Sequence, residues 1–548
     1  MKTRTHDMTE EPDLRHSTGT GPTAKLRPVY QNLMPPCNHA CPAGENIQAW
    51  MSLVHEKRYE EAWQTILADN PLPGVHGRVC YHPCETSCNR DQVDAAVSVH
   101  QVERFLGDMA IKENWSPRII KAPSGKRVLI VGAGPSGLSA AYHLRRLGHE
   151  VEIRDAGPVA GGMLHFGIPA YRLPRQVLRD EIARIEKMGV VITLNHNVID
   201  LELERRDGNF DAVFVAIGAH LSKKINIPAR EAGKILDAVS FLRNVSLGEQ
   251  PNIGRRVAIY GGGNTALDAA RTAKRLGAEE ALIIYRRDQD NMPAHPEELS
   301  DALDEGVKVN WLRTINAIDG ETITVEKMEL DENGRPQPSG EIEQLSADAL
   351  ILALGQQSDT QLLTNLPGIK FDKDGTVQVA DNMMTGCPGV FAGGDMVPSE
   401  RTVTVATGHG KKAANNIDQF IRGCITQQNN SAKPASKEIA HLEDLRIWFY
   451  SQAEQSKQPS APLATRENNF EEVLGALTTQ QAHYEASRCY SCGNCFECDG
   501  CFGACPEQAI IKLGTGKFYQ IDYSKCTGCS ACTLQCPTAA IHMTNNTV

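Results

Sequence analysis

Cysteine is the residue type in this sequence whose spacing is best suited to chemistry. Fifteen of the 17 cysteines lie within two segments, residues 37–88 and 489–536. Near the C-terminus the spacing C-x2-C-x2-C-x3-C-P occurs twice, and the second copy follows the first by 31 residues at every position. Cysteines clustered in this way favour metal binding over disulfides, because short spacing lets one loop surround a metal centre. Thiolates are soft ligands that suit iron.

The two copies resemble the motif pair of a two-cluster bacterial ferredoxin. In that family the fourth cysteine of each motif binds the cluster of the other motif. The resemblance implies two [4Fe–4S] clusters, one on Cys495, Cys498, Cys501 and Cys536, the other on Cys505, Cys526, Cys529 and Cys532. A zinc site is the alternative, although zinc motifs rarely repeat three cysteines at two-residue intervals.

A strand, a glycine turn, a helix and a second strand are predicted over residues 126–156. Gly132, Gly134 and Gly137 form G-x-G-x-x-G directly after an apolar run. These glycines permit a tight turn, close approach of the backbone to a pyrophosphate, and packing of the helix on the strand. Asp155 ends the second strand, where a carboxylate binds the ribose hydroxyls of a dinucleotide.

A second unit of the same kind is predicted over residues 255–287. Its turn has the pattern G-x-G-x-x-A, and its candidate binding residues are Gly261, Gly263, Asn264 and Ala266. The second strand ends in Arg286 and Arg287 in place of an acid. Guanidinium groups pair with a 2′-phosphate that a carboxylate would repel, so the sequence favours NADPH over NADH. Asp288 weakens this preference, and the alternative is that both arginines only solvate the end of a strand.

Residues 390–415 predict a return to the first dinucleotide domain. A strand runs into Gly394 and Asp395, and a helix rich in small residues follows. Asp395 is expected to contact the ribityl or pyrophosphate region of a flavin, and the alternative is a turn-forming Asp. The second domain is therefore expected to be inserted in the first.

Five motifs together resemble the flavoprotein small subunit of glutamate synthase, a family shared with the N-terminal half of dihydropyrimidine dehydrogenase. They are GAGPSGL, GGMLHFGIPAYRLP, GGGNTALDAAR, YRRDQDNMPA and PGVFAGGD. The resemblance covers roughly residues 31–424. It implies FAD in the first domain, with Gly161 and Gly162 near the isoalloxazine, and NAD(P)H in the second. Asp155 stands where the family usually has Glu, which preserves the carboxylate.

The N-terminal cysteines match the iron–sulfur domain of this family, which holds two [4Fe–4S] clusters. These cysteines are Cys37, Cys41, Cys80, Cys84 and Cys88. Five cysteines cannot fill eight ligand positions, and the family pattern places a non-cysteine ligand at Glu103. The resemblance thus implies one cluster on Cys41, Cys80, Cys84 and Glu103. For Glu103 a solvated helix face remains the alternative.

Residues 470–493 resemble the segment that normally begins the glutamate synthase small subunit. If this segment docks on the N-terminal domain, Cys489 and Cys492 join Cys37 and Cys88 in a further [4Fe–4S] cluster. The chain would then hold four clusters, leaving Cys387 and Cys424 as packed thiols. The alternative is that Cys489 and Cys492 are spare thiols beside the ferredoxin motif.

The expected fold is multidomain α/β, with two Rossmann-like dinucleotide-binding domains, an N-terminal all-α iron–sulfur domain and a C-terminal α+β ferredoxin domain. The expected division is a flexible tail (1–30), the iron–sulfur domain (31–122), the FAD domain (123–250 and 376–424), the NAD(P)H domain (251–375), a linker (425–469) and the ferredoxin-like domain (470–548).

The sequence favours an oxidoreductase that passes a hydride from NADPH to FAD and then single electrons through [4Fe–4S] clusters to a partner, or the reverse. No catalytic side chain is expected, because the flavin carries the chemistry. Alternatives are a glutamate synthase small subunit, the NADP-linked subunit of a 2-oxoacid:ferredoxin oxidoreductase, and a redox-sensing scaffold. The partner is expected to be a ferredoxin or a catalytic oxidoreductase subunit, in a cytoplasmic hetero-oligomer. The net charge of −11 disfavours nucleic acid and anionic membrane surfaces.

Overall fold

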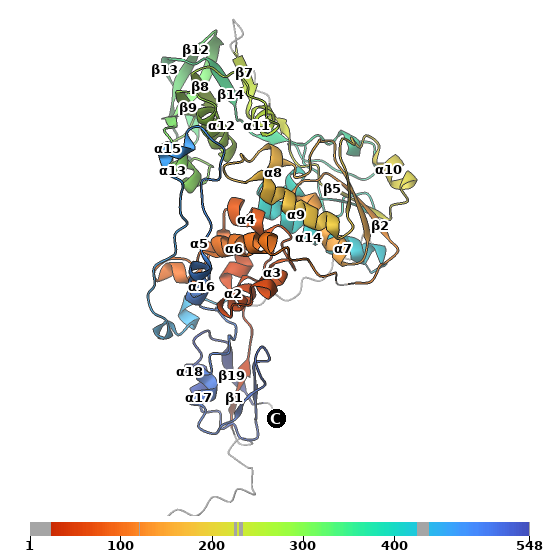
Figure 1. Ribbon diagram of the computed structural model, residues 1–548, viewed down its shortest axis with the longest axis vertical. Coiled ribbons are helices and arrows are strands. Elements are labelled where there is room, and N and C mark those ends of the chain that lie inside the picture. Colours follow the sequence, from red (N-terminus) through yellow and green to blue (C-terminus); the bar gives the residue numbers. More distant parts are fainter. Residues whose placement is uncertain (1–23, 120, 224–226, 229–233, 425–437, 547–548) are drawn as a thin grey trace, which may run out of the picture.

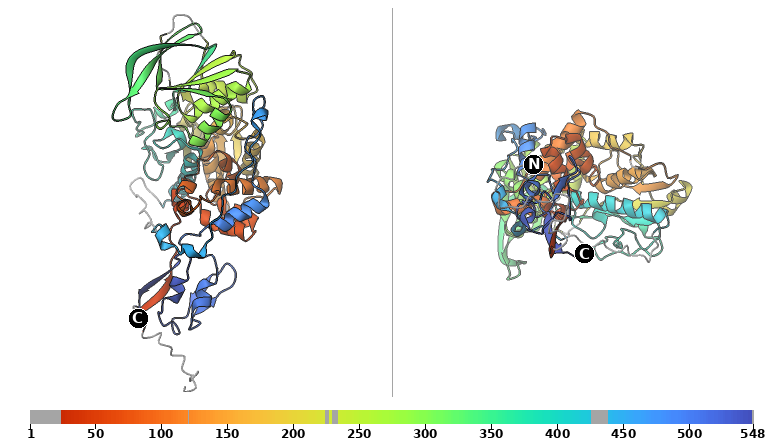
Figure 2. Two further views of the ribbon diagram at one scale, coloured as in Figure 1. Left: turned by 90° about the vertical axis from the view of Figure 1, so that its left-hand side faces the viewer. Right: turned by 90° about the horizontal axis from the view of Figure 1, so that it is seen from below.

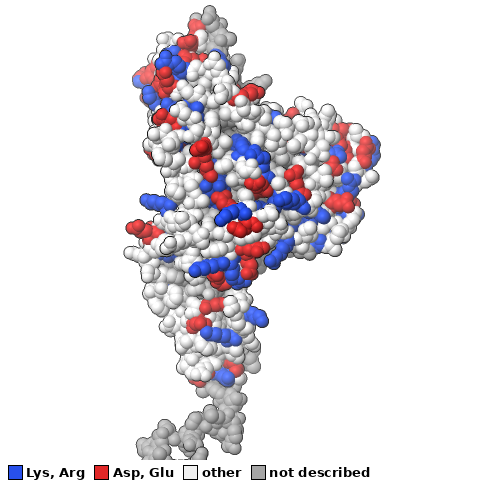
Figure 3. Space-filling view, viewed as in Figure 1, with Lys and Arg blue, Asp and Glu red and all other residues white. Residues whose placement is uncertain are grey.

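The computed structural model describes residues 24–119, 121–223, 227–228, 234–424 and 438–546. Figure 1 shows the NAD(P)H domain at one end, the ferredoxin module at the other, and the N-terminal helices between them. The side view in Figure 2 shows the same order along the long axis. On the face shown in Figure 3, acidic and basic side chains are interspersed.

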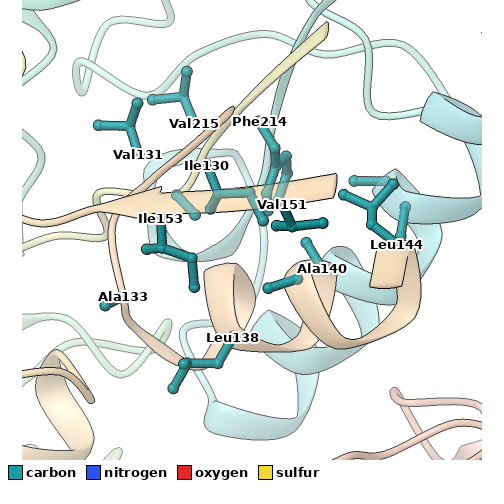
Figure 4. Packing of buried hydrophobic residues seen from close by; sticks show 14 of the residues in the cluster. Ile130, Val131, Ala133, Leu138, Ala140, Leu144, Val151, Ile153, Phe214 and Val215 are labelled. Carbon is teal, nitrogen blue, oxygen red and sulfur yellow. The ribbon is translucent and has the colours of Figure 1, made fainter. Parts of the chain in front are cut away.

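The FAD domain is built on a parallel sheet of five strands. In spatial order these are β16 (Val390–Ala392), β5 (Ala212–Val215), β2 (Arg127–Val131), β3 (Glu150–Arg154) and β4 (Val191–Thr193). The sheet is covered by α7 (Pro135–Arg146), α9 (Arg175–Lys187) and α14 (Val403–Ile421), and α8 (Met163–Phe166) and α10 (Leu201–Asp207) lie in its connections. Ala140 and Leu144 of α7 face Val151 of the sheet in one buried core (Figure 4). The central strands β2 and β5 are nearly continuous apolar runs because both faces of the sheet are buried there.

The NAD(P)H domain repeats this architecture. Its parallel sheet has the order β10 (Lys308–Trp311), β9 (Glu280–Tyr285), β8 (Arg256–Tyr260), β14 (Ala349–Leu352) and β7 (Lys234–Asp237). Its helices are α11 (Ala238–Ser246), α12 (Asn264–Arg275) and α13 (Pro296–Asp304). An antiparallel sheet of β11 (Arg313–Asp319), β12 (Thr322–Leu330) and β13 (Pro336–Ser346) is attached to it.

The boundaries between these two domains differ from the expected ones. The strand β7 and the helix α11 precede residue 251 but belong to the NAD(P)H sheet and core. The chain crosses between the domains at β6 (Leu221–Ser222) and β15 (Gln356–Gln357), which pair with each other. Leu363, which follows the second crossing, is buried in the FAD-domain core. The insertion therefore runs roughly between the two paired strands, because parallel pairing of β14 with β7 draws the earlier segment into the second sheet.

The N-terminal domain is all helical as predicted. It comprises α1 (Pro36–Ala40), α2 (Ile47–His55), α3 (Tyr59–Ile66), α4 (Pro73–Val79), α5 (Pro83–Thr86) and α6 (Val99–Lys112). It is joined to the FAD domain by Glu181 of α9, whose buried carboxylate accepts hydrogen bonds from the backbone N–H groups of Gly74 (2.9 Å) and Val75 (3.0 Å) at the start of α4. A carboxylate at a helix N-terminus satisfies free amides and complements the helix dipole.

The C-terminal module contains α17 (Gly500–Ala504), β17 (Ile510–Lys512), β18 (Tyr519–Ile521), α18 (Ala531–Leu534) and β19 (Ile541–Asn545). The expected tail is wrong over residues 26–30, because β1 (Leu26–Tyr30) pairs antiparallel with β19. The amide and carbonyl groups of each strand satisfy those of the other. The remainder of the expected tail, up to residue 23, lies outside the described residues.

The expected linker is also wrong over its described part, since residues 438–469 pack on other domains. The Met34 N–H donates to the Glu438 carbonyl (2.8 Å). Farther along, residues 450–475, here called the strap, include α15 (Leu463–Arg466) and run past three domains. Arg78 of α4 binds the strap through Glu472 (2.7 Å), and the Val473 N–H donates to the Tyr171 carbonyl of the FAD domain (3.0 Å). Residues 425–437 lie outside the described residues.

Candidate active site and cluster sites

A cavity of about 1010 Å³ lies between the two dinucleotide domains. Both glycine turns reach it. Of the predicted dinucleotide-binding residues, eight line it: Gly132, Gly134, Asp155, Gly162, Gly263, Asn264, Gly394 and Asp395. The predicted residues outside its lining are Gly137, Gly161, Gly261, Ala266, Arg286 and Arg287.

The glycines of the first turn divide into two roles. Gly132 has φ +108°, and a Cβ on Gly137 would lie 2.0 Å from the Gly132 carbonyl oxygen, so these two allow the turn and the close contact of helix with strand. A Cβ on Gly134 would meet nothing within 4 Å, and the same is true of Gly263 in the second turn. The middle glycine of each turn thus leaves open space at the cavity wall, which is where a pyrophosphate approaches the backbone. The two turns fit dinucleotides.

Asp155 is positioned by the backbone of the first turn. Its Oδ2 accepts a hydrogen bond from the Ala133 N–H (2.6 Å), and its Oδ1 accepts one from the Gly157 N–H (2.7 Å). The carboxylate lies at the end of β3 and at the cavity wall. This is the geometry in which an acid binds the ribose of a dinucleotide.

The predicted glycine pair near the flavin ring packs against the same turn. The Gly161 N–H donates to the Ala133 carbonyl (2.9 Å). Gly162 has φ +54°, and a Cβ there would lie 2.9 Å from the Gly134 Cα. Gly162 is therefore required for the close approach of α8 to the first turn.

Gly394 and Asp395, which follow β16, also form part of the cavity wall. The Gly394 N–H donates to His409 Nδ1 (3.2 Å), and a Cβ on Gly394 would lie 3.1 Å from the Ser136 Cβ. Burial raises the pKa of Asp395 to about 6. Asp395 lines the cavity, as expected of a residue that contacts a bound flavin.

The second turn is shaped by neighbours in its own domain and by Tyr81 of the N-terminal domain. Gly261 has φ +147°, and a Cβ there would lie 2.3 Å from the Ala353 carbonyl oxygen. Asn264 Nδ2 donates to the Tyr81 hydroxyl (2.5 Å), and Asn264 Oδ1 accepts from the His295 N–H (2.8 Å). Ala266 is fully buried beneath the turn.

The predicted phosphate-binding arginines lie at the end of β9, outside the cavity lining. Arg286 is exposed. Arg287 is half-buried, and its Nε has no hydrogen-bond partner among the described residues. Binding of a 2′-phosphate by these two arginines stays a prediction.

Sequence reasoning missed several residues of the cavity wall. They include Tyr81, Arg172, Arg243 and Asp268. Tyr81 comes from the N-terminal domain, between two predicted cluster cysteines, and Arg172 belongs to the AYRLP segment. The only signal for them was membership in these motifs, because their cavity-facing positions arise from contacts between domains.

The predicted site of Cys41, Cys80, Cys84 and Glu103 adjoins this cavity. Val79 and Tyr81, on either side of Cys80, both line it. Cys80 Sγ accepts hydrogen bonds from the Thr404 hydroxyl of α14 (3.0 Å) and from the His82 N–H (3.3 Å). Burial raises the pKa of Cys84, and Glu85, Cys80 and Cys41 are close enough to raise it further.

Glu103 lies inside the protein. Its side chain is in a residue only 5% exposed, so the alternative of a solvated helix face is wrong. Glu103 Oε1 accepts a hydrogen bond from Asn70 Nδ2 (2.7 Å), which also donates to Glu45 Oε1 (3.0 Å). Burial and then the Glu45 carboxylate raise the pKa of Glu103. A buried carboxylate is otherwise costly, so a metal ligand role suits this position.

The segment 470–493 docks on the N-terminal domain. Its helix α16 (Thr479–Arg488) packs against α2 and α6, and Leu477, Ala482 and Ala486 join the buried core of those helices. The last turn of α16 leads directly into Cys489.

This docking brings Cys489 and Cys492 to two cysteines of the N-terminal domain. The pKa of Cys37 is raised by burial and then by Cys489, Cys492 and Cys88 in turn. Asn89 Nδ2 lies 3.5 Å from Cys492 Sγ. The four thiols of the predicted cluster are thus neighbours, although more than 400 residues separate the two halves of the set in sequence.

The ferredoxin cysteines lie in two groups, and ligation of a cluster by each group stays a prediction. The pKa of Cys495 is raised to about 12, chiefly by burial, and Cys501, Cys536 and Cys498 add to the increase. A small cavity on the other side of the module is lined by the cysteines of the second set, Cys505, Cys526, Cys529 and Cys532.

The two remaining cysteines differ from each other. Cys387 is buried in the FAD-domain core, as expected of a packed thiol. The same expectation is wrong for Cys424, which is exposed after the end of α14.

Comparison with known proteins places this architecture in a family. The model for pyridine nucleotide-disulphide oxidoreductases matches residues 126–410, the model for dihydropyrimidine dehydrogenase domain II with its 4Fe-4S cluster matches residues 29–115, and a 4Fe-4S binding domain matches residues 519–542. The chain belongs to the pyridine nucleotide-disulphide oxidoreductase family, with an iron–sulfur domain on either side. The predicted fold class is confirmed.

Three proteins of known function are similar to this chain over most of its length. The chain is 37% identical over 503 residues to the NADP(+)-dependent formate dehydrogenase subunit beta of Moorella thermoacetica, which covers 83% of this chain and 70% of that protein. It is 32% identical to the NADPH-Fe(3+) oxidoreductase subunit beta of Geobacter sulfurreducens, covering 87% and 78%. It is 33% identical to the glutamate synthase [NADPH] small chain of Escherichia coli, covering 71% and 89%. The predicted resemblance is confirmed, and the chain is an oxidoreductase. Among the described residues, no helix combines the length and the apolar character that a bilayer crossing requires.

Proposed function

We propose that this chain is the electron-transfer subunit of a larger oxidoreductase, with NADPH, FAD and four [4Fe–4S] clusters as its redox groups. The observation that carries the proposal is the cavity between the domains, which both glycine turns reach and which residues on either side of Cys80 also line. A dinucleotide on each turn and a cluster at Cys80 would meet at this one place.

The residues of the chain bind and orient the redox groups. The first turn, Asp155 and Asp395 would hold FAD, and the second turn would hold NADPH, with Arg286 and Arg287 on its 2′-phosphate. FAD held there would supply the chemistry of accepting a hydride from a nicotinamide and releasing two electrons singly. The protein supplies position and exclusion of water, so no side chain has to act as an acid or base.

The cluster sites form a continuous series from this cavity to the ferredoxin module. Cys37 is one of the neighbours that raise the pKa of Cys84, which links the first site to the second. Tyr450 lies beside thiols of the second and third sites, because Cys489, Cys492, Cys498 and Cys536 all add to the burial that raises its pKa. The order we propose is the Cys80 site, the Cys37 and Cys489 site, the Cys495 site and the Cys526 site. Either direction of flow is chemically open, since the surroundings of each cluster set its potential.

The partner we propose is a catalytic oxidoreductase subunit or a ferredoxin that exchanges electrons with the C-terminal module. The three relatives are named as subunits or chains of NADP-linked enzymes, which supports a hetero-oligomer. A formate dehydrogenase-like assembly is favoured over a glutamate synthase-like one by the longer match, because the glutamate synthase relative covers 71% of this chain and the formate dehydrogenase relative 83%.

The proposal is tested by mixing the anaerobic, fully loaded protein with NADPH in a stopped-flow instrument. Flavin bleaching followed by cluster bleaching, and then steady reduction of a viologen, is the expected result. Flavin bleaching without cluster reduction would contradict the proposed series. No reduction of either group would favour a redox-sensing scaffold. Affinity purification from the native cell extract then identifies the subunit that accompanies the chain.

A further inference from the structure

Arg172 crosses from the FAD domain into the NAD(P)H domain at the wall of the cavity. Its side chain is only 12% exposed. Its Nη1 donates to both carboxylate oxygens of Asp268 on α12, at 3.0 and 2.8 Å, and its Nη2 donates to Glu298 on α13. The two terminal nitrogens of the guanidinium thus bind carboxylates on two different helices of the NAD(P)H domain, which fixes the orientation of the planar group as well as its distance.

The partner helix of Arg172 is the one that begins at the second glycine turn. Asp268 follows Asn264 by one helical turn, so both project from the same face of α12 and both line the cavity. Asn264 is held by the Tyr81 hydroxyl of the N-terminal domain (2.5 Å). The helix that would carry the pyrophosphate of NADPH is therefore held by residues of both neighbouring domains.

The covalent connection between the two dinucleotide domains consists of two short chain segments. The chain crosses between them at β6 and β15, a two-stranded ribbon. Among the described residues, the two large sheets share no strand. The relative orientation of the domains must be fixed by contacts between side chains. Besides Arg172, these include the buried ring of Tyr171, with the Arg275 guanidinium of α12 centred 3.8 Å from it.

We propose that Arg172 is a positioning residue that locks the NAD(P)H domain against the FAD domain in the orientation needed for hydride transfer. The inference rests on the proposed function, because it assigns the two turns to NADPH and FAD. Hydride transfer requires reacting atoms about 3–3.5 Å apart. A domain that swings on a two-stranded ribbon cannot maintain such a distance without a contact of this kind.

The test uses the loaded, full-length protein with Arg172→Met, Arg172→Lys and Asp268→Asn. Arg172→Met keeps the length of the side chain and removes the charge. Arg172→Lys keeps the charge but has one nitrogen in place of the two that bind Asp268 and Glu298. Asp268→Asn weakens the contact from the other domain while conserving volume. Arg255→Met is the matched control, since Arg255 is exposed and pairs with Glu279 within the NAD(P)H domain.

Two readouts separate positioning from binding and from folding. The first is single-turnover reduction of the flavin by NADPH, with the dissociation constant of NADP⁺ measured alongside. We expect Arg172→Met to slow flavin reduction by about tenfold to a hundredfold, with an unchanged dissociation constant and unchanged FAD and iron content. Arg172→Lys should recover part of the rate of flavin reduction. Asp268→Asn should slow flavin reduction, as Arg172→Met does. The control should reduce its flavin at the wild-type rate.

The second readout is hydrogen exchange of the β6–β15 ribbon and of α12, which does not depend on activity. If Arg172 holds the two domains together, the ribbon and α12 should exchange faster in Arg172→Met and not in Arg255→Met. Wild-type exchange in these segments, or a rate of flavin reduction that remains at the wild-type value, would overturn the assignment. If NADPH fails to reduce even the wild-type flavin, the proposed function is wrong, and the exchange measurement still decides whether Arg172 locks the domains. If Arg172→Met loses FAD, Asp268→Asn takes its place in both measurements, and the same results support or overturn the assignment.

Discussion

Replacing Arg488 by Met should release α16 from the N-terminal domain. Arg488 is 2% exposed and is the last residue of α16, directly before Cys489. Its Nη1 donates to the Ala96 carbonyl (2.8 Å), and its Nη2 donates to the Ala95 carbonyl (2.7 Å). The guanidinium therefore joins the C-terminal segment to the loop that precedes α6.

The loss of free energy expected on replacing Arg488 follows from the ion pair that Arg488 makes with Glu485. Glu485 is fully buried, and Arg488 Nη1 donates to its Oε2 at 2.8 Å. Removing one partner of a buried ion pair costs about 3–5 kcal/mol, because the other charge stays buried without compensation. The Ser98 N–H (3.0 Å) and the Ser456 N–H (2.6 Å) also donate to Glu485, so the carboxylate keeps some partners and the lower half of this range is expected.

The assay is hydrogen exchange of the amides of α16, which reports the free energy of local opening. Each 1.4 kcal/mol is about a factor of ten, so a loss of about 3 kcal/mol accelerates exchange by roughly a hundredfold. Arg58→Met is the control, since Arg58 makes its ion pairs with Glu56 and Glu61 on the surface of the same domain. Unchanged protection of α16 in Arg488→Met would refute the reasoning. So would equal acceleration throughout the protein, because the loss is predicted to be local.

Three further predictions concern the nucleotide, the outlet and the flavin. Replacing both Arg286 and Arg287 by Ala should raise the KM for NADPH much more than that for NADH, because charge-assisted hydrogen bonds contribute about 1.5–3 kcal/mol each; equal effects on the two nucleotides would remove the assignment. Truncation after Gly493 should leave flavin reduction by NADPH intact and abolish transfer to the partner, and full-rate transfer by the truncated chain would mean that electrons leave elsewhere. Burial raises the pKa of Asp395 from 3.8 to about 6, so its contribution to the stability of the flavin-free protein is full below pH 3.8 and is lost as the pH rises through 6. Asp395→Asn should therefore flatten the fall in melting temperature over that interval, and a slope equal to that of the wild type would show that Asp395 is not its source.

Local pattern was enough to predict both dinucleotide turns. The glycines of a turn are dictated by steric contacts within a few residues, such as that of Gly137 with the Gly132 carbonyl. The crossed grouping of the ferredoxin cysteines was implied by the resemblance of the duplicated motif to a two-cluster bacterial ferredoxin. The docking of residues 470–493 was predicted from resemblance, and small residues such as Ala482 and Ala486 give α16 the face that packs on α2.

Contacts between distant segments were not predictable from local pattern. The strand β1 is short, contains Pro28 and lies beside a polar stretch, so nothing nearby marked it as a strand that pairs with β19. Residues 438–469 were read as a linker for the same reason, since their polar composition hides contacts such as that of the Ala453 N–H with the Asp94 carboxylate. Arg172 was marked only by its place in the AYRLP motif, because its role depends on where α12 of another domain lies.

The central claim is that Cys489 and Cys492, at the C-terminal end of the chain, complete a cluster in the N-terminal domain. The most direct test is the iron content of the anaerobically reconstituted protein and of its Cys489→Ser/Cys492→Ser variant, together with the electron paramagnetic resonance spectra of the reduced proteins. Four [4Fe–4S] clusters predict about sixteen iron atoms per chain in the wild type, and about twelve in the variant with the signal of one cluster lost. About twelve iron atoms in the wild type, or no loss of iron and no change of spectrum in the variant, would contradict the account.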